Sequence, residues 1–350
     1  MNQVHFVLPN DIDDPARPSG GNIYDRRVID GLAGSGWAVT EHSARGAWPS
    51  PSPHDLAQLG RCLAQLPPGA ITVLDGLVAC AAGQVIKEHA TRLRLVVLMH
   101  MPPAGAGEEA AMAVADAVVT TSQWCRNHLL NRYQLPPERV HVAIPGVCRQ
   151  PVAAGSAAGS SLLSVGAVLP HKGHDLLARA LAGLAELPFQ LTCVGSTDLD
   201  PDYAAAVRRQ LHLSGVAQRV TFTGPLTGKD LRARFAEADL LVVASRADSY
   251  GMAVTEALAH GLPVLATTAQ GLPEAVGRTP EGAVPGLLVP PGDPAALRDA
   301  LARWLGSQEL RQQLRKLARQ RRATLADWAA TTAVFAALLA ATASGRLQRA

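Results

Sequence analysis

The chain has 350 residues, of which 48% are hydrophobic and 4% aromatic, and its formal net charge is +3. A chain of this length can bury two cores, because one core seldom grows beyond ~250 residues. So small a charge with so few aromatic residues provides neither the electrostatic footprint nor the stacking side chains of a nucleic-acid-binding protein. We therefore expect a globular protein of two domains that does not bind nucleic acid.

The N-terminal residues carry no recognisable targeting signal. "MNQVHFVLPND" lacks a basic segment followed by an apolar one, and no later stretch holds the ~20 apolar residues of a membrane span. The five cysteines are scattered without C-x-x-C spacing, which argues against a disulfide framework and against a zinc site. We expect a cytoplasmic protein without a metal site.

The first 150 residues alternate short apolar runs with helical patterns. The runs are "VHFVLP", "AITVLD", "RLVVLMH", "DAVVTTS" and "RVHVAIPG", and the helical patterns span Asn22 to Ala33 and Leu77 to Ala90. Continuous apolar strands separated by helices are typical of a parallel sheet that is covered on both faces. The pattern predicts a Rossmann-like, doubly wound α/β domain over residues 1–150.

The small residues of "QPVAAGSAAGSS", Gln150 to Ser161, cannot pack a core and predict a flexible connector. The apolar runs then resume as "SLLSVGAV", "FQLTCVG", "VTFTG", "DLLVVAS", "PVLAT" and "GLLVPPG", which predicts a second doubly wound domain over residues 160–324. Ligands of such sheets bind beyond the carboxyl ends of the strands, so two facing domains would form an interdomain cleft. Functional residues are therefore expected directly after strands.

Two helices close the chain. "LRQQLRKLARQRR" places Arg311, Arg315 and Arg319 at helical spacing with leucines on the other side. This predicts a solvated helix face, because a membrane-surface patch would also need exposed aromatic residues. Membrane-surface contact stays open but unsupported. The Ala-rich apolar helix of about residues 325–350 is expected to pack back onto the first domain.

The stretch "SRADSYGMAVTEALAHGLPVLAT" places two carboxylates, Asp248 and Glu256, directly after the apolar strand "DLLVVA". A helix is expected from Gly251 to His260, ended by Gly261. Its free N-terminal amides favour an anion such as phosphate. The candidate binding positions are Asp248, Ser249, Tyr250, Gly251, Met252, Ala253 and Glu256.

A nucleotide sugar fits this spacing, because Glu256 lies about two turns below Asp248 and the two carboxylates must meet different parts of one ligand. Sugar hydroxyls would lie at Asp248, the diphosphate at the helix start and the ribose hydroxyls at Glu256. The alternative is that one carboxylate only caps the helix and the other is an exposed helix residue.

Lys172 and Gly173 follow a strand and precede a helix in "SVGAVLPHKGHDLL". A lysine there would neutralise charge that develops on a leaving diphosphate, and Gly173 would allow close backbone approach. Gly166, at the end of the same strand, is included in the candidate donor site. A plain turn is the alternative interpretation of the Lys-Gly pair.

Two further candidates lie in the first half. Gly20 and Gly21 in "RPSGGNIYDRR" open the first helix after the first strand, although no G-x-G-x-x-G and no P-loop motif is present, so a plain turn is the alternative. His100 ends the strand "RLVVLMH" before two prolines. We expect it to be neutral at pH 7 and to bond a sugar hydroxyl or shield developing positive charge, with a capped core histidine as the alternative.

Together these stretches resemble a family-4 glycosyltransferase, a group of retaining enzymes with the GT-B fold of two facing Rossmann-like domains. The match runs along nearly the whole chain. Its most specific part is the E-x7-E signature, written here as Asp248 to Glu256 and followed by "GLPEAVG" and "GLLVPPGD". The resemblance implies transfer of a sugar, with retention, from a nucleotide diphosphate sugar to a hydroxyl of an acceptor that the sequence does not identify. It implies no cofactor besides this co-substrate.

The resemblance also implies residue roles. It places Gly20 and Gly21 at the donor loop, His100 by the transferred sugar, Lys172 on the diphosphate, Thr223, Gly224 and Pro225 near the base, and Glu256 on the ribose. The catalytic candidates are His100, Lys172 and Asp248, of which Asp248 would orient the sugar rather than act as a nucleophile.

Two positions depart from the family pattern. Asp248 replaces the first glutamate of the signature, and Ala167 stands where the family has an arginine, which leaves the diphosphate clamp incomplete. A sugar-nucleotide-binding module without turnover is therefore one alternative. A nicotinamide-dependent oxidoreductase is another, but it would need the absent glycine fingerprint with an acidic residue ~20 positions later.

Overall fold

The computed structural model describes residues 2–102 and 106–345 and divides the chain into two compact α/β units. The first unit contains the described residues up to Asp14, Gly20–Gly146 and the described residues from Ala326 onward. The second contains Pro15–Ser19 and Val147–Leu325. Residues from both ends of the described chain therefore build the first unit, and the short segment Pro15–Ser19 is assigned to the second.

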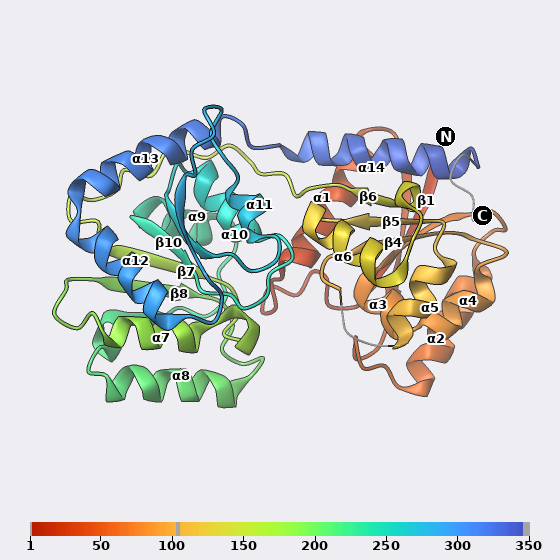
Figure 1. The fold of residues 1–350 in the computed structure, drawn as a ribbon. Coiled ribbons are helices and arrows are strands. Elements are labelled where there is room, and N and C mark those ends of the chain that lie inside the picture. Colours follow the sequence, from red (N-terminus) through yellow and green to blue (C-terminus); the bar gives the residue numbers. More distant parts are fainter. Residues whose placement is uncertain (1, 103–105, 346–350) are drawn as a thin grey trace. The chain divides into compact units, whose positions relative to one another are not determined.

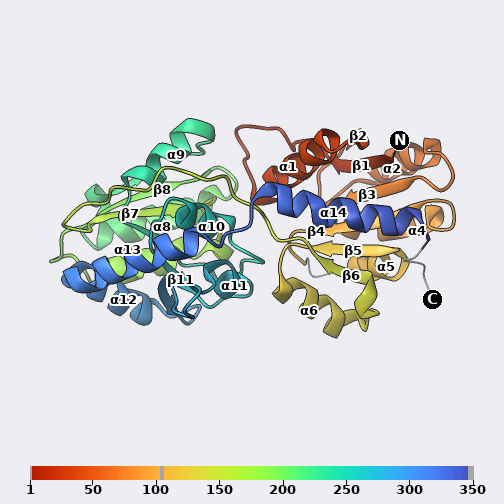
Figure 2. The same ribbon diagram turned by 90° about the horizontal axis from the view of Figure 1, so that it is seen from above.

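The first unit has a six-stranded parallel sheet with the order β2-β1-β3-β4-β5-β6 (Figures 1 and 2). Its strands are β1 (Gln3–Pro9), β2 (Ala38–Ala44), β3 (Ile71–Asp75), β4 (Arg94–Met99), β5 (Ala117–Thr120) and β6 (Val140–Val142). The five predicted apolar runs are strands here. The sequence missed β2, because this edge strand is polar and its residues are mostly exposed or half-buried.

The helices of the first unit lie on both faces of this sheet (Figure 1). They are α1 (Gly20–Gly34), α2 (Pro53–Gln65), α3 (Gly76–Ala81), α4 (Gly83–His89), α5 (Ala106–Val114), α6 (Gln123–Tyr133) and α14 (Trp328–Ala343). The helical pattern predicted from Leu77 to Ala90 is thus two helices. Val7, Leu74 and Val97 face the core that α2 to α6 cover.

Helix α14 packs beside α1 on the other face of the first sheet (Figures 1 and 2). The rings of Phe6 in β1 and Phe335 in α14 stack with centroids 6.2 Å apart. Thr331 donates a hydrogen bond to the Ile144 carbonyl at 2.8 Å. Residues 346–350 of the predicted final helix lie outside the described residues.

The second unit has its own parallel sheet, of order β12-β11-β10-β7-β8-β9. Its strands are β7 (Ser161–Val165), β8 (Gln190–Val194), β9 (Val220–Phe222), β10 (Leu240–Val243), β11 (Val264–Thr267) and β12 (Gly286–Val289). Each of the six apolar runs that follow the predicted connector forms one of these strands. The prediction of two doubly wound α/β domains is confirmed.

Seven helices of the second unit are α7 (His174–Ala182), α8 (Pro201–Leu213), α9 (Gly228–Glu237), α10 (Met252–Ala259), α11 (Leu272–Val276), α12 (Pro294–Gly306) and α13 (Gln308–Arg322). Helices α7, α8 and α12 cover one face of the sheet, and α9 and α10 cover the other (Figure 1). Trp304 of α12 is fully buried in the core. Its indole nitrogen donates to the Gly159 carbonyl at 2.7 Å.

The predicted flexible connector, Gln150 to Ser161, is instead anchored on the second unit. The Ser156 hydroxyl donates to Asp239 at 2.7 Å, and the Arg315 guanidinium bonds both Asp239 and the Ser156 carbonyl. Asp239 is fully buried, so these bonds satisfy a charge that would otherwise be costly. These bonds oppose the expectation of a flexible connector, because small residues allow the backbone to lie close to polar partners.

Helix α13 does not present a fully solvated arginine face either. Arg311 is only 7% exposed and donates to the carbonyls of Trp304 and Leu305. Arg315 is committed to Asp239 at 2.8 Å. Two of the three predicted surface arginines therefore hold the fold. None of the described helices combines the length and the apolar character that crossing a bilayer would require.

Candidate functional site

Lys172 lies in a short 3-10 turn, Pro170–Lys172, between β7 and α7. The next residue, Gly173, has φ +71°, and a Cβ there would lie 2.1 Å from the Ala244 carbonyl oxygen beyond β10. Only glycine permits both this conformation and this approach. The Lys-Gly sequence thus brings the lysine turn against the carboxyl end of the neighbouring strand.

Asp248 is the partner of this lysine. It follows β10, and its Oδ2 lies 2.7 Å from the Lys172 Nζ. The side chains are 13% and 24% exposed, so the ion pair is partly shielded from water. The structure therefore brings together two of the three predicted catalytic residues, which are 76 positions apart in the sequence.

The segment after Asp248 leads into helix α10, whose N-cap is Gly251. In the described part of the chain, the first amide beyond Asp248 to donate to a backbone carbonyl is that of Val254, which bonds Gly251 at 2.9 Å. The predicted binding residues 249–253 thus present amides at a helix start, which suits an anion. Glu256 is half-buried one turn into the helix.

Glycines follow the adjacent strands β7 and β8. They lie between the segment after Asp248 and the turn of Thr223 to Pro225, which was predicted to lie near the base of the nucleotide. Gly166 follows β7 and its amide bonds the Val194 carbonyl, while Gly195 follows β8 and its amide bonds the Gly224 carbonyl at 3.0 Å. A Cβ on Gly195, which has φ +155°, would lie 2.1 Å from the Gly166 carbonyl oxygen. The predicted residues Gly166 and Thr223 to Pro225 therefore share one edge of the sheet, with Gly195 between them.

Arg246 stabilises the lysine turn. Its guanidinium bonds Asp175 with two contacts of 2.7 Å and donates to the Pro170 carbonyl at 2.8 Å. Hydrogen bonds from Arg246 and Tyr203 outweigh the effect of burial and hold the pKa of Asp175 well below its ordinary value. Arg246, the cation nearest in sequence to Asp248, is thus already bound to the Asp175 carboxylate through a bidentate ion pair, an arrangement that is common for arginine.

The first unit holds a second cluster, centred on His100 at the carboxyl end of β4. Its Nε2 lies 2.7 Å from Asp25 Oδ1 in α1 and 3.5 Å from Asp75 Oδ2 at the end of β3. A Cβ on Gly21 would lie 3.0 Å from the His100 ring, so the predicted donor-loop glycine packs directly against it. Gly20, the other predicted glycine, is the first residue of α1.

Burial lowers the pKa of His100, but the negative charges of Asp25 and Asp75 outweigh it, and the pKa is raised above its ordinary value of 6.5. The raised pKa opposes the prediction of a neutral ring at pH 7. Burial together with the neighbouring Asp25 charge raises the pKa of Asp75. Two carboxylates this close cannot both ionise easily.

In the described part of the chain, one group of three side chains, Asp25, Asp75 and His100, has its potential ligand atoms within 4.8 Å of one another. The 2.7 Å separation of His100 and Asp25 is that of a charge-assisted hydrogen bond with the proton between the two atoms. We therefore interpret the cluster as a hydrogen-bonded one. The sequence did not place Asp25 or Asp75 in any site, although a carboxylate at the end of the buried run "AITVLD" was a usable signal.

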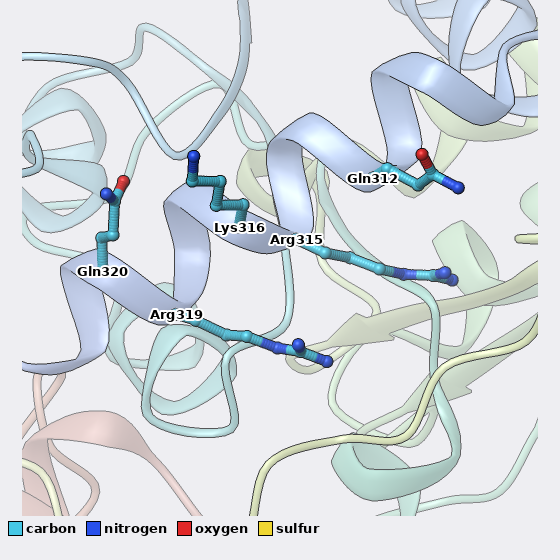
Figure 3. A pocket seen from close by; sticks show the side chains of 5 residues that line it. All are labelled: Gln312, Arg315, Lys316, Arg319 and Gln320. Atoms are coloured by element: carbon cyan, nitrogen blue, oxygen red, sulfur yellow. The ribbon is translucent and has the colours of Figure 1, made fainter.

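A pocket on the second unit contains none of the predicted site residues. Figure 3 shows its five lining side chains, which all project from helix α13. They are Gln312, Arg315, Lys316, Arg319 and Gln320. Because Arg315 is already bound to Asp239, this pocket offers less free charge than its composition suggests.

The family model described as "Glycosyl transferases group 1" matches residues 159–307. A D-inositol 3-phosphate glycosyltransferase of Salinispora arenicola is 34% identical over 238 residues, covering 61% of this chain and 52% of the relative. One of Salinispora tropica is 33% identical over 252 residues, covering 63% of this chain and 50% of the relative. This chain thus spans about half the length of the curated relatives it matches.

Solved structures resemble almost the whole chain. Sucrose-phosphate synthase from Thermosynechococcus elongatus has a TM-score of 0.77 at 23% identity, covering 96% of this chain and 98% of its own. Anabaena HepE, solved in complex with UDP-glucose, has a TM-score of 0.75 at 17% identity, covering 96% of this chain and 99% of its own. At these identities the likeness shows the fold, which is GT-B.

Proposed function

We propose that the protein is a retaining glycosyltransferase, because residues 159–307 match the family model described as "Glycosyl transferases group 1". It would move a sugar, of the hexosyl type, from a nucleotide diphosphate sugar to an acceptor hydroxyl. HepE, a structural neighbour, binds UDP-glucose, which makes a uridine diphosphate hexose the first donor to test.

The observation that carries the proposal is the contact of Lys172 with Asp248 beside the α10 helix start. One cation and a row of available amides lie at the carboxyl end of β7 and β10, where ligands of parallel sheets bind. The diphosphate would take the cation and the amides. Asp248 would then accept hydrogen bonds from hydroxyls of the sugar.

The reaction we propose is a same-face substitution. The bond between the sugar anomeric carbon and the phosphate oxygen breaks, and a bond from that carbon to the acceptor oxygen forms on the same face. The acceptor proton passes to the leaving phosphate oxygen. Lys172 and the α10 amides stabilise the charge on that oxygen, as preorganised donors do in a transition state.

His100 is assigned to the transferred sugar, and Gly20 and Gly21 to the donor loop. The contact of Gly21 with the His100 ring supports a common site for these residues within the first unit. The turn at Gly224, where a Cβ would meet nothing within 4 Å, leaves space that supports a flat ligand such as a base, and the Lys172 side chain lies beside Gly166 at the same edge of the sheet.

The test is sugar transfer by the full chain. Uridine, guanosine and adenosine diphosphate hexoses are supplied singly with a panel of polyols that includes inositol phosphates, and nucleoside diphosphate release is measured. Acceptor-dependent release with one donor is expected, and the anomeric coupling in the proton NMR spectrum of the product should match that of the donor. An inverted product would contradict the retaining mechanism.

Two alternatives have their own outcomes. Tight nucleotide-sugar binding without hydrolysis or transfer on any acceptor would indicate a binding module. Thermal stabilisation by NAD but not by nucleoside diphosphates would indicate an oxidoreductase, since a ligand raises stability only in proportion to its binding.

A further inference from the structure

The two carboxylates beside His100 have no role in the donor contacts proposed above. Asp25 is fully buried, and its Oδ2 has no hydrogen-bond partner among the described residues. Asp75 is 3% exposed and accepts one bond, from the Leu77 amide at 2.7 Å. Burying two acidic groups side by side lowers the free energy of unfolding, so we expect the pair to serve a function that offsets this loss of stability.

We propose that Asp25 and Asp75 are positioning residues that anchor His100 through Nε2, leave Nδ1 to face the ligand and keep a proton on Nδ1. The proposal rests on the proposed function, because it assigns the protonated ring to an oxygen of the sugar donor. It adds two residues, Asp25 and Asp75, for which no role was predicted from the sequence.

The geometry fixes the ring from several sides. Asp25 lies one helical turn after Gly21 on α1, so the glycine contacts the ring and the carboxylate bonds it from the same helix face. The Tyr24 ring meets the His100 ring edge-on, with centroids 5.3 Å apart, and the Tyr24 hydroxyl is tied to the Ala143 carbonyl at 2.8 Å. His100 therefore has little freedom to rotate.

The hydrogen bond decides which nitrogen meets a ligand. With Nε2 donating to Asp25, a neutral ring carries no proton on Nδ1, and that atom can only accept. In the described part of the chain, Nδ1 has no partner of its own, and the side chain is 18% exposed. A protonated ring reverses the role of Nδ1, which then donates to a hydroxyl or phosphate oxygen.

Charge around the ring favours the protonated form. Among the described residues, the titratable groups that face the cluster are Asp25 and Tyr24 from α1, Asp75 from β3, and Cys80 of α3 beyond Asp75. Tyr24 and Cys80 are neutral because burial raises the pKa of each. Because its pKa is raised, Asp75 can stay protonated and share its proton with Asp25. The pair of carboxyl groups then carries one negative charge, which balances the positive charge of a protonated His100.

The experiment compares Asp25→Asn, Asp75→Asn and the control Asp30→Asn, which alters an exposed residue of the same helix. The His100 ring titration is followed by NMR, with its signal assigned by its loss in His100→Gln. Removing an adjacent carboxylate charge should lower the midpoint by about 1 pH unit or more in Asp25→Asn. Asp75→Asn should lower it less, and Asp30→Asn should leave it unchanged.

Turnover provides the second measurement. In the unaltered chain, kcat should fall as the pH rises through the midpoint of the His100 titration. In Asp25→Asn this fall in kcat should occur at lower pH, so that lowering the pH of the assay restores kcat. The donor KM of the variant should stay within about twofold of that of the unaltered chain. A purely structural role would lower kcat at every pH. An unchanged His100 midpoint in Asp25→Asn overturns the proposal whether or not sugar is transferred. A shifted midpoint with no transfer by the unaltered chain would overturn only the proposed function.

Discussion

Lys172 Nζ lies 2.7 Å from Asp248 Oδ2, so two residues assigned to different parts of one ligand are ion partners of each other. A diphosphate at the α10 helix start would have to draw Lys172 partly away from this carboxylate. Asp248 would then turn toward hydroxyl donors of the sugar. Before a ligand binds, the ion pair thus keeps the Lys172 ammonium and the Asp248 carboxylate together at the site, each neutralising the charge of the other.

Replacing Lys172 with alanine should reduce kcat by about 10² to 10³, equivalent to ~3 to 4 kcal/mol, because it removes the preorganised cation on the leaving oxygen. Steady-state kinetics and circular dichroism would measure the loss with the fold intact. Lys316→Ala, an exposed lysine of the same unit, is the control. Near-normal turnover of Lys172→Ala would show that another cation stabilises the leaving oxygen.

Ala167→Arg should tighten nucleoside diphosphate binding by about 1.5 to 3 kcal/mol, because a charged hydrogen bond would restore the second cation of the clamp. Ala167 is half-buried directly after Gly166, at the strand end that also carries the Lys172 turn. Calorimetric titration of the variant and of the unaltered chain measures the difference. Equal affinities would show that an arginine at this position does not reach the phosphates.

Gly195→Ala should destabilise the second unit by about 1 to 3 kcal/mol and weaken nucleotide binding, because its Cβ would press on the Gly166 carbonyl. Urea unfolding and nucleotide titration give the two values. Gly306→Ala is a suitable control, since a Cβ there meets nothing within 4 Å. If Gly195→Ala binds nucleotide normally, the edge of the sheet at Gly166, Gly195 and Gly224 is not the base site.

Glu256→Ala should raise the donor KM by about tenfold with little change in kcat, because a ribose contact is the same in the ground state and the transition state. Kinetics with varied donor concentration separate the two constants. Glu281→Ala changes an exposed acidic residue of the same unit and serves as the reference. A collapse of kcat at constant KM would place Glu256 at the reacting centre instead.

His174 should make the second unit acid-sensitive. Burial lowers its pKa to about 4, and neither ring nitrogen has a hydrogen-bond partner among the described residues. The unfolded chain binds the proton near pH 6.5, so stability is present above that pH and is lost as the pH falls toward 4.

The loss should reach about 2 kcal/mol between pH 7 and pH 5. Urea unfolding of His174→Leu at both pH values should show a flatter dependence than the unaltered chain, while His212→Leu, at an exposed histidine, should not. The same slope in all three proteins would assign the acid sensitivity to other groups.

The sequence by itself determined the two α/β domains and the positions of nearly all their strands along the chain. Buried strands of a parallel sheet are continuous apolar runs, and eleven such runs stand in the sequence with helices between them. The polar edge strand β2 lacks this pattern and was missed. The sequence also predicted Lys172 and Asp248 as site residues, since each lies in a segment that follows a strand, and the structure places the two side chains in contact.

Tertiary structure alone decided how these residues are supported. His100 and Asp25 are 75 positions apart, and Asp239 meets Ser156 from 83 positions away, so no local pattern predicts either contact. The charge state of His100 and the anchoring of the predicted flexible connector both depend on such partners. A residue's type and its place in a strand or helix follow from local sequence, whereas its pKa and its mobility depend on groups that only folding brings within a few ångströms.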